Sequence, residues 1–410
     1  MAETKRADKA SSIWTPTFII LLVINFFFSM SQMMNNNIIP LYARDIGLTA
    51  SIIGFVMSVF YIAALCVRPF SGPAYDSFSK KRLLQIAYAV TVFANFMYVF
   101  AANQFILITA RIIHGMALGC IAPLTMAFVS DILPTERMAS GLSIYTTAQV
   151  LAQVIGPAFG IEMTRFVGYQ LTFIISASSM TLAGLLTFFL KEPPLTEARP
   201  PYRIGISRII VARGVPTAIC LMLMAIGFAC IVSFIAIYAE AMGMMDIGVY
   251  FMVYAVVMMA TRPIAGRLAD QFGINKVLMP SIICFAVALF VLSFARTLPM
   301  FIVVAVIAAF GYGTALPLLQ SMPFKFVPRS KSGAASNTNY IALDIGLLCG
   351  PLLGGHIVDA LLPITGSEWA AYAGMFRLAV IPTLLALVLF LLLRKRLARY
   401  EAEAATARGE

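Results

Sequence analysis

Residues 68–76 read RPFSGPAYD, and residues 262–270 read RPIAGRLAD. Both stretches carry an Arg-Pro pair, a glycine and an aspartate, and they stand 194 residues apart (68 to 262). The same offset, with no gap, relates Gly54 to Gly248, Gly119 to Gly313, Pro123 to Pro317, and Gly156-Pro157-x-x-Gly160 to Gly350-Pro351-x-x-Gly354. Matches that cluster at glycine, proline and charged positions indicate a tandem duplication of about half the chain. Parallel repeats with a site between them are a transporter architecture.

The composition predicts an integral membrane protein. Hydrophobic residues are 61% of the chain, charged residues 11%, and the mean hydropathy is +0.91, whereas soluble domains are nearer half apolar and a quarter charged. Apolar stretches long enough to cross a bilayer core of roughly 30 Å recur along the chain. We expect twelve spans, at residues 16–39, 49–74, 83–101, 105–130, 139–163, 169–190, 214–239, 247–268, 277–296, 299–324, 333–358 and 371–393.

These spans predict an all-α fold of two pseudo-symmetric six-helix bundles. We expect the bundles at residues 1–190 and 214–395, a cytoplasmic linker at 191–213 and a cytoplasmic tail at 396–410. The linker is rich in proline and basic residues, which suits a polar connector. No cleavable signal peptide is expected, because the first ten residues are polar and the first span is too long for one.

The distribution of Lys and Arg predicts the orientation. With both termini in the cytoplasm, the basic residues fall on the cytoplasmic side with five exceptions, which are Arg44, Arg111, Arg165, Arg296 and Arg377. The net charge of +11 is then explained by a face that meets the anionic leaflet of a bacterial inner membrane. No nucleic-acid partner is expected.

The sequence favours a transporter over an enzyme. Its six cysteines show no CxxC spacing and it has only two histidines, so we expect no metal and no cofactor. It has no G-x-x-x-x-G-K-[ST] loop for ATP, so uphill transport must draw on a gradient of protons or sodium. We expect a monomer in the lipid bilayer that acts on a small-molecule substrate.

The repeated stretch resembles the loop signature of the major facilitator superfamily, G-x-x-x-D-[RK]-x-G-[RK]-[RK]. The first copy has Gly72, Asp76, Lys80 and Lys81, but Ser77 and Ser79 depart from the pattern. The second copy keeps Gly266, Asp270 and Gly273 and has Gln271 in place of a basic residue. The resemblance extends over essentially the whole chain and implies the fold described above and transport by alternating access.

Two span motifs resemble further signatures of that superfamily. Arg111-Ile-Ile-His114-Gly115 matches the R-x-x-x-G of span 4. The antiporter signature G-x-x-x-G-P-x-x-G-G is partial in span 5 and complete in span 11, from Gly346 to Gly355. The resemblance therefore implies the twelve-span drug:proton antiporter branch, which exports its substrates.

We expect the loop-signature residues of both repeats to form a cytoplasmic gate, made of Arg68, Gly72, Asp76 and Arg137 and of their repeat mates Arg262, Gly266, Asp270 and Lys331. Glycine permits close helix approach, and an anion is stabilised at a helix N-terminus. Asp76 is expected to face the start of span 11, and Asp270 the start of span 5. The alternative is a static glycine interface with a solvated aspartate.

The Gly-Pro motifs predict a matched pair of helix kinks, because proline removes a backbone donor at membrane depth. The residues are Gly156, Pro157 and Gly160 in span 5, and Gly350, Pro351 and Gly354 in span 11. Such kinks would shape a central cavity and limit ion leak. Static packing is the alternative.

Arg111 is the leading candidate for the substrate cavity, because a charge inside a span is costly and usually faces a bundle interior. Its repeat mate is Ala305, so the duplicated architecture does not require it. His114 follows at i+3 on the same face. We expect Arg111 to face the amides of span 1, which are Gln32, Asn35, Asn36 and Asn37. The alternative is a structural hydrogen-bond anchor.

Asp344 is the only acidic residue deep within a predicted span, and its repeat mate is Val150. It shares a helix face with Asn337 and Tyr340. Desolvation favours the protonated carboxyl unless a cation lies nearby, which suits a proton carrier or a counter-ion, although a structural pairing is also open. Further candidates for the cavity are Gln149, Gln153 and Tyr254, and the stripe of Tyr250 and Tyr254 also suits simple packing.

The predicted activity is proton-coupled export of a small amphipathic organic compound. The alternative is uptake of a small organic solute by symport or exchange, with Arg111 binding an anionic group. Antiporters of the resembling branch often carry their acid in the N-terminal half, where this chain has amides in span 1. We therefore expect Asp344 to carry the proton, with Glu162 and Glu240 as the other candidates.

Overall fold

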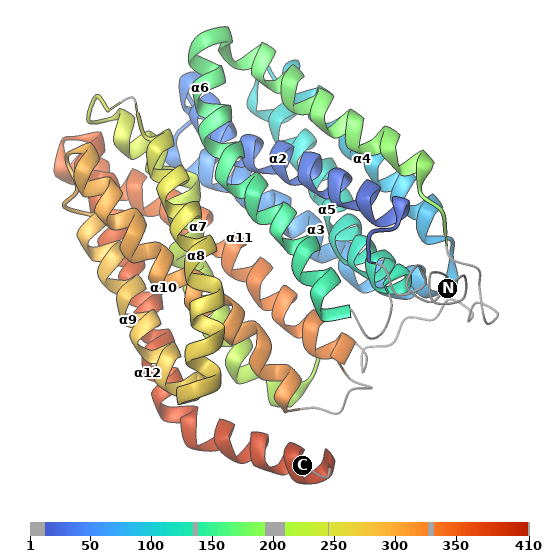
Figure 1. The fold of residues 1–410 in the computed structure, drawn as a ribbon. Coiled ribbons are helices and arrows are strands. Elements are labelled where there is room, and N and C mark those ends of the chain that lie inside the picture. The colour runs from blue at the N-terminus through green and yellow to red at the C-terminus, as the bar shows by residue number, and fades with distance from the viewer. Residues whose placement is uncertain (1–12, 134–137, 193–209, 245, 327–331, 409–410) are drawn as a thin grey trace. The chain divides into compact units, whose positions relative to one another are not determined.

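The computed structural model describes residues 13–133, 138–192, 210–244, 246–326 and 332–408. Within these ranges every regular element is a helix (Figure 1), which confirms the all-α prediction. The elements are α2 (Pro16–Asp45), α3 (Ala50–Ser77), α4 (Lys80–Val99), α5 (Gln104–Ile132), α6 (Met138–Leu186), η2 (Thr187–Phe189), η4 (Ala212–Gly214), α7 (Val215–Glu240), α8 (Gly248–Phe272), α9 (Ile274–Leu292), α10 (Leu298–Lys325), α11 (Ser332–Thr365) and α12 (Glu368–Arg408).

Eleven helices of the described chain are long and apolar enough to cross a membrane, and α6 accounts for the difference from the twelve spans predicted. The apolar stretch formed by α6 and η2 covers 42 residues, Ala148–Phe189, about twice the length that one crossing needs. At Gly168 the helix is interrupted by φ 78° and ψ 173°, a conformation open to glycine. Figure 1 shows the two arms of α6 running in opposite directions, so they correspond to spans five and six.

By its internal contacts the chain divides into two units. Unit 1 comprises Met1–Asn35 and Ala63–Ile204, and unit 2 comprises Asn36–Ile62 and Gly205–Glu410. The division passes through α2 and α3, so each of these helices contributes to both units. The segment 36–62 thus belongs to unit 2 although it lies in the first sequence repeat.

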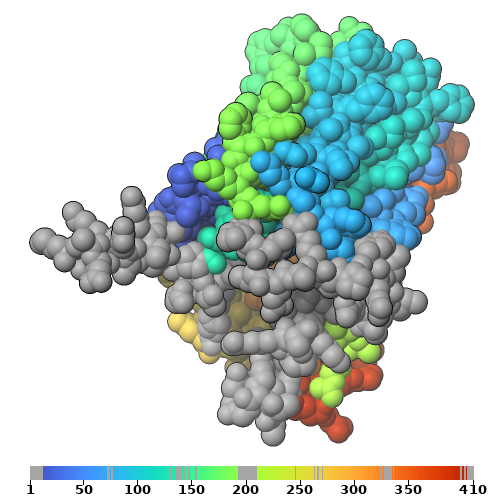
Figure 2. All heavy atoms as spheres, turned by 90° about the vertical axis from the view of Figure 1, so that its right-hand side faces the viewer, coloured from blue at the N-terminus to red at the C-terminus, as the bar shows by residue number. Residues whose placement is uncertain are grey.

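Unit 1 is built around α4, which packs against both α5 and α6. Figure 2 shows one face of the unit, with α4 in blue beside the second arm of α6 in green. Large apolar side chains fill the interior, among them Phe18, Leu21, Tyr88, Phe128 and Met180. Their burial supplies the apolar contact between the helices that membrane proteins depend on for packing.

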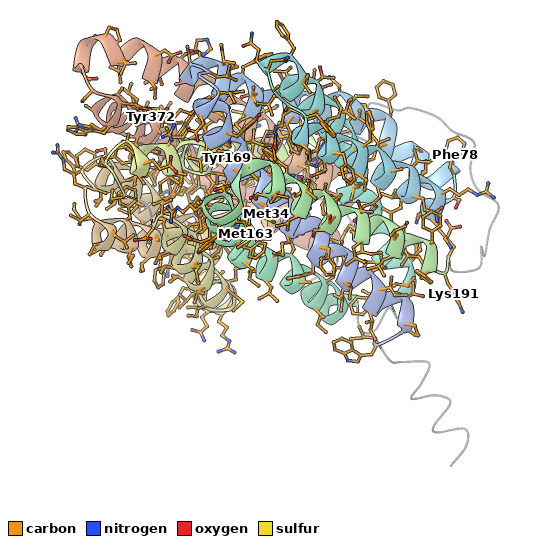
Figure 3. All side chains as sticks on the ribbon, turned by 90° about the horizontal axis from the view of Figure 1, so that it is seen from above. Met34, Phe78, Met163, Tyr169, Lys191 and Tyr372 are labelled. Atoms are coloured by element: carbon orange, nitrogen blue, oxygen red, sulfur yellow. The ribbon has the colours of Figure 1, made fainter. Side chains whose placement is uncertain are left out.

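Glu192 fastens one end of unit 1. Its carboxylate accepts from the Ser79 hydroxyl (3.0 Å) and from the backbone N–H of Lys81 (3.0 Å). The Lys81 ammonium in turn donates to the carbonyl oxygen of Phe188 (2.8 Å). The end of the second α6 arm is therefore tied to the start of α4, and Figure 3 shows Lys191 and Phe78 at this end.

Unit 2 is organised around α7, which packs against α11 and α12. Most of its side chains are buried, as expected of a helix that is apolar on all sides. A Cβ atom on Gly346 or Gly350 of α11 would come within 2.4 or 2.5 Å of the carbonyl oxygens of Met222 and Ile226 in α7. These two glycines therefore allow the backbones of α7 and α11 to touch.

One contact occurs in both units at repeat-related positions. A Cβ atom on Gly119 of α5 would lie 2.7 Å from the carbonyl oxygen of Ala64 in α3. A Cβ atom on Gly313 of α10 would lie 2.7 Å from Cγ of Met258 in α8. Ala64 and Met258 are related by the same offset as the two glycines. The duplication inferred from the sequence is therefore also a duplication of helix packing.

Candidate functional site

A closed network of buried polar side chains joins α2, α4 and α6 in unit 1. The Asn35 amide donates to Oδ1 of Asn95 (2.6 Å) and accepts from the Ser176 hydroxyl (3.0 Å). The Ser31 hydroxyl lies 2.8 Å from that of Ser176 and 3.3 Å from Oδ1 of Asn95. All four residues are buried. Because an unbonded buried polar group is costly, these bonds hold the three helices in one register.

Arg111 and His114 of α5 both reach Tyr98 of α4. The Tyr98 hydroxyl lies 2.9 Å from Nδ1 of His114, and the Arg111 guanidinium hydrogen-bonds the same hydroxyl. Arg111 and His114 are 0% exposed, so their i, i+3 spacing puts both on the face of α5 that meets α4. A guanidinium this deeply buried is stable only with hydrogen-bond partners around it.

Sequence analysis missed Tyr98 and Asn95, which are central to these two clusters. A usable signal was present in the repeat. The mate of Tyr98 is Leu292 and the mate of Asn95 is Leu289, so a polar residue stands where the other copy has leucine. The same asymmetry singled out Arg111, whose mate is alanine.

The amides predicted on span 1 are all buried in α2. Asn35 uses both its donor and its acceptor in the network described above. Asn25, which the sequence did not single out, donates to the carbonyl oxygen of Tyr145 (2.9 Å). Within the described chain, Oε1 of Gln32 has no hydrogen-bond partner. The α2 amides thus serve helix packing at two positions at least.

Asp344 lies in α11 with 5% of its surface exposed. Asn337 and Tyr340, which precede it on the same face, are half-buried. Gly346 follows two residues later, on the opposite side of the helix, and approaches the α7 backbone. On a neighbouring face, Asn339 donates to the carbonyl oxygen of Gln320 in α10 (2.7 Å). The carboxyl is therefore buried in α11, and the glycines of the same helix make the close approach to α7.

Tyr254 belongs to an aromatic cluster of α7, α8 and α10. Its ring stacks on that of Tyr250 (centroids 6.2 Å, planes 11° apart), and Phe228 stacks on Tyr312 (4.2 Å, 6°). Phe228 and Tyr254 are 6.2 Å apart. Among the described residues, the hydroxyls of Tyr250 and Tyr254 are buried without a hydrogen-bond partner. The stacked rings explain the packing of this cluster, but they do not explain why two of its residues carry a hydroxyl.

The predicted cytoplasmic gate is described only in part. Arg68 and Arg262 are half-buried on α3 and α8. Outside the residues whose side chains the structure describes lie Gly72, Asp76, Arg137, Gly266, Asp270 and Lys331, and also Gln153 of the predicted cavity. Gln149, another cavity candidate, is exposed on α6. The gate accordingly stays a prediction.

The Gly-Pro motifs mark helix contacts that correspond between the units. A Cβ atom on Gly156 of α6 would lie 2.7 Å from Cβ of Met33 in α2, and Gly350 of α11 meets α7 in the same way. Pro157 lies inside the first arm of α6, and Pro351 lies inside α11. Gly160 is buried, and a Cβ atom on Gly354 would lie 3.1 Å from the Phe234 ring. Span five therefore packs on span one as span eleven packs on span seven.

Eleven long apolar helices in the described ranges, with buried polar clusters within the repeats, are the architecture of a polytopic membrane transporter. The sequence profile of the Major Facilitator Superfamily matches residues 21–245 and 217–409. The protein therefore belongs to the Major Facilitator Superfamily and is a transporter, not an enzyme.

Two curated relatives from Staphylococcus aureus are similar in sequence. The staphylopine export protein of strain Mu50 / ATCC 700699 is 22% identical over 374 residues, which cover 88% of this chain and 92% of the relative. The quinolone resistance protein NorA of the same strain is 26% identical over 157 residues, which cover 38% of this chain and 40% of the relative.

Solved structures share the fold at low sequence identity. The nucleoside transporter NupG superposes with a TM-score of 0.74 at 14% identity, over 92% of this chain and 99% of NupG. A bacterial homologue of the human lysosomal transporter Spinster gives 0.73 at 15% identity, over 95% and 97%. A D-xylose–proton symporter gives 0.70 at 13% identity, over 89% and 96%. Identities this low speak for the fold alone.

Proposed function

We propose that the protein exports a small amphipathic organic compound across the bacterial inner membrane in exchange for protons. The observation that carries the proposal is the similarity over 88% of the chain to a protein named for export. The complete antiporter signature in α11, from Gly346 to Gly355, supports the same direction. Two parallel repeats supply the architecture for alternating access.

Asp344 is the proposed proton carrier. Its burial in α11 means that a change in the helix packing around it alters how well the carboxyl is solvated. Solvation is the main control on whether a buried carboxyl holds its proton. A conformational cycle that exposes Asp344 to each side in turn would therefore load and release a proton.

Arg111 is proposed as a positioning residue within unit 1. It is fully buried against Tyr98 and His114, which leaves its guanidinium engaged inside the unit. The alternative function, uptake of an anionic solute that Arg111 binds, requires that guanidinium to face the substrate. The burial of Arg111 supports export as the first choice, and the cytoplasmic gate of Asp76 and Asp270 remains part of the proposal.

The test begins with a thermal-shift screen of the purified protein against aromatic cations, zwitterions and carboxylic acids. Compounds that bind are then followed in proteoliposomes with an imposed pH gradient, and separately with an imposed sodium gradient. We expect the pH gradient to drive accumulation of the compound against the proton flow. Transport that follows the proton flow, or that responds only to sodium, would contradict the proposal.

A further inference from the structure

Asp359 of α11 binds the first turn of α3. Its Oδ1 accepts from the backbone N–H of Ala50 (3.1 Å), and its Oδ2 accepts from that of Ser51 (2.9 Å). Thr49 accepts from the N–H of Ile52 through its hydroxyl (3.5 Å). The first amides of a helix have no partners within it. A carboxylate 308 residues away in sequence therefore completes the N-terminal cap of α3.

The backbones of α3 and α11 touch on either side of this cap. A Cβ atom on Gly355 would lie 2.1 Å from the carbonyl oxygen of Ala50, and one on Gly54 would lie 2.1 Å from that of Pro351. One turn further along α3, the Ser58 hydroxyl donates to the carbonyl oxygen of Leu348 (2.7 Å). The described contact thus combines close glycine surfaces with hydrogen bonds.

An ion pair flanks the same contact. Arg44, near the end of α2, pairs with Glu240 at the end of α7. Arg44 and Ala50 stand on either side of the short connection between α2 and α3. The segment 36–62 of the first repeat is therefore held to two helices of the second repeat, and both attachments are electrostatic.

This attachment is not a duplicated feature of the fold. The repeat mates of Asp359 and Gly355 are Arg165 and Ile161. A guanidinium has no acceptor and cannot cap a helix N-terminus, and Arg165 pairs with Glu162 (2.9 Å). The helix that corresponds to α3 is α8, whose N-cap residue Ile247 makes no side-chain cap hydrogen bond. The carboxylate at position 359 is therefore not required by the duplicated fold, and we look for its role in a function specific to one repeat.

We propose that Asp359 is a positioning residue of the transport cycle, whose carboxylate holds the α2–α3 end of the first repeat closed against α11 and releases it each time that end opens. The proposal rests on alternating access as proposed above, and it requires neither proton coupling nor export. In the predicted orientation this end faces the outside of the cell.

The chemistry of the contact suits repeated opening and closing. Charged acceptors bind helix N-termini strongly where water is excluded. When the end opens, water can take over the same hydrogen bonds. Glycine surfaces separate without any side-chain rearrangement. The bond is therefore strong enough to favour the closed end and simple enough to break once in every cycle.

The test measures the distance between the two attached elements in Asp359→Asn. Spin labels are placed at Leu48, in the α2–α3 connection, and at Ile364, which is 78% exposed at the end of α11, in a chain freed of its six cysteines. Asparagine keeps the shape but loses the charge and one acceptor. We expect the population with the longer distance to rise roughly tenfold. Asp359→Glu restores most of the short-distance population.

Two further variants make the test specific. Glu368→Gln removes an exposed carboxylate in the first turn of α12, at the end of α11 that carries Asp359, and should leave the distances unchanged. Ala50→Pro removes one of the two N–H donors at a position where proline fits the start of a helix. We expect it to raise the long-distance population a few-fold. It also carries the test if Asp359→Asn does not fold.

The outcomes separate a latch from a structural bond and from the proposed function. A lower melting temperature in Asp359→Asn with unchanged distances would overturn the inference, because the carboxylate would then only stabilise the fold. Unchanged distances in Ala50→Pro would overturn it as well. A shifted population in a protein that fails to exchange substrate for protons would keep the latch and reject the coupling.

Discussion

The two repeats place opposite chemistry at matching positions. In unit 1 the buried core carries Ser31, Asn35, Asn95, Tyr98, Arg111 and His114, and the repeat mates in unit 2 are Ala225, Ala229, Leu289, Leu292, Ala305 and Ala308. Both versions are buried, and both fit the same helix packing. The duplicated fold therefore requires buried side chains at these positions but does not require them to be polar. We infer that the polar network serves a function specific to the first repeat.

Unit 2 shows the reverse asymmetry at other positions. Tyr250, Tyr254 and Asp344 have the repeat mates Val56, Phe60 and Val150. Unit 2 thus adds hydroxyls and one carboxyl at positions where the first repeat is apolar. The proposed function accordingly assigns the proton carrier to unit 2, whereas the buried cation Arg111 lies in unit 1.

The largest expected effect is on coupling, and it tests the acid of unit 2. Asp344→Asn should abolish uphill transport driven by a pH gradient, because the amide cannot carry a proton. Downhill exchange should survive, since the helices that move are unchanged, and substrate binding should become independent of pH. Flux measurements in proteoliposomes, with and without the gradient, check this. Gradient-driven flux equal to wild type would move the search to Glu162 or Glu240.

Removing the cation of unit 1 should produce the largest loss of stability. Arg111→Ala opens a cavity in unit 1 and leaves the polar partners of the guanidinium buried and unbonded, so we expect a loss of about 3–5 kcal/mol. Arg111→Lys keeps the charge but not the planar donors, and it should still impair transport. Fluorescence-detected melting and flux report the two effects. A melting temperature of Arg111→Ala equal to wild type would show that unit 1 tolerates the apolar chemistry of unit 2.

The polar network can be converted stepwise into its apolar counterpart. Asn95→Leu, which installs the residue of the other repeat, should cost about 1–3 kcal/mol because Asn35 and Ser31 lose a partner. Adding Ser31→Ala, Asn35→Ala and Ser176→Ala should recover part of that loss, because the orphaned groups are then gone. Melting curves of the single and combined variants test this. Losses that simply add would argue against a coupled network.

The smallest expected effect is on stability, when one tyrosine in each unit is replaced by phenylalanine. Tyr254→Phe installs the repeat mate and removes a hydroxyl without a described partner, so stability should stay level or rise by up to about 1 kcal/mol. Tyr98→Phe removes the hydroxyl that meets His114 and Arg111, and stability should fall by about 1–2 kcal/mol. Melting temperatures that fall, or rise, for both variants would contradict the claim that only the Tyr98 hydroxyl stabilises its unit.

Features that repeat or recur along the chain were predictable from the sequence. Helical spans follow from runs of apolar residues, and the offset between Gly119 and Gly313 anticipated a packing contact that occurs in both units. The face shared by Arg111 and His114 followed from helix geometry. Each of these rests on local spacing or on the comparison of one repeat with the other.

Features that depend on unrelated positions were not predictable. Asn95 and Ser176 are single polar residues in apolar helices, and no periodicity pairs them with Asn35. Asp359 and Ala50 are far apart in the chain. Gly54 and Gly355 predict a close helix approach, but the sequence does not indicate which helix lies opposite. A carboxylate at a helix N-terminus was expected at Asp76, whereas the caps that the structure describes are made by Glu192, which bonds the N–H of Lys81 in α4, and by Asp359 at the α2–α3 end.

Both arms of α6 contact the first part of α2. The first arm presses Gly156 against Met30 and Met33, and the second arm bonds α2 through Ser176 to Asn35 and through Ser179 to the carbonyl oxygen of Phe27 (3.0 Å). The part of α2 that contacts α6 through these residues ends at Asn35, which is also the last α2 residue of unit 1. Just beyond lies Pro40, which cannot donate to the carbonyl of Asn36. The carbonyl of Asn36 therefore lacks its usual intrahelical partner, so bending α2 costs least within residues 36–40.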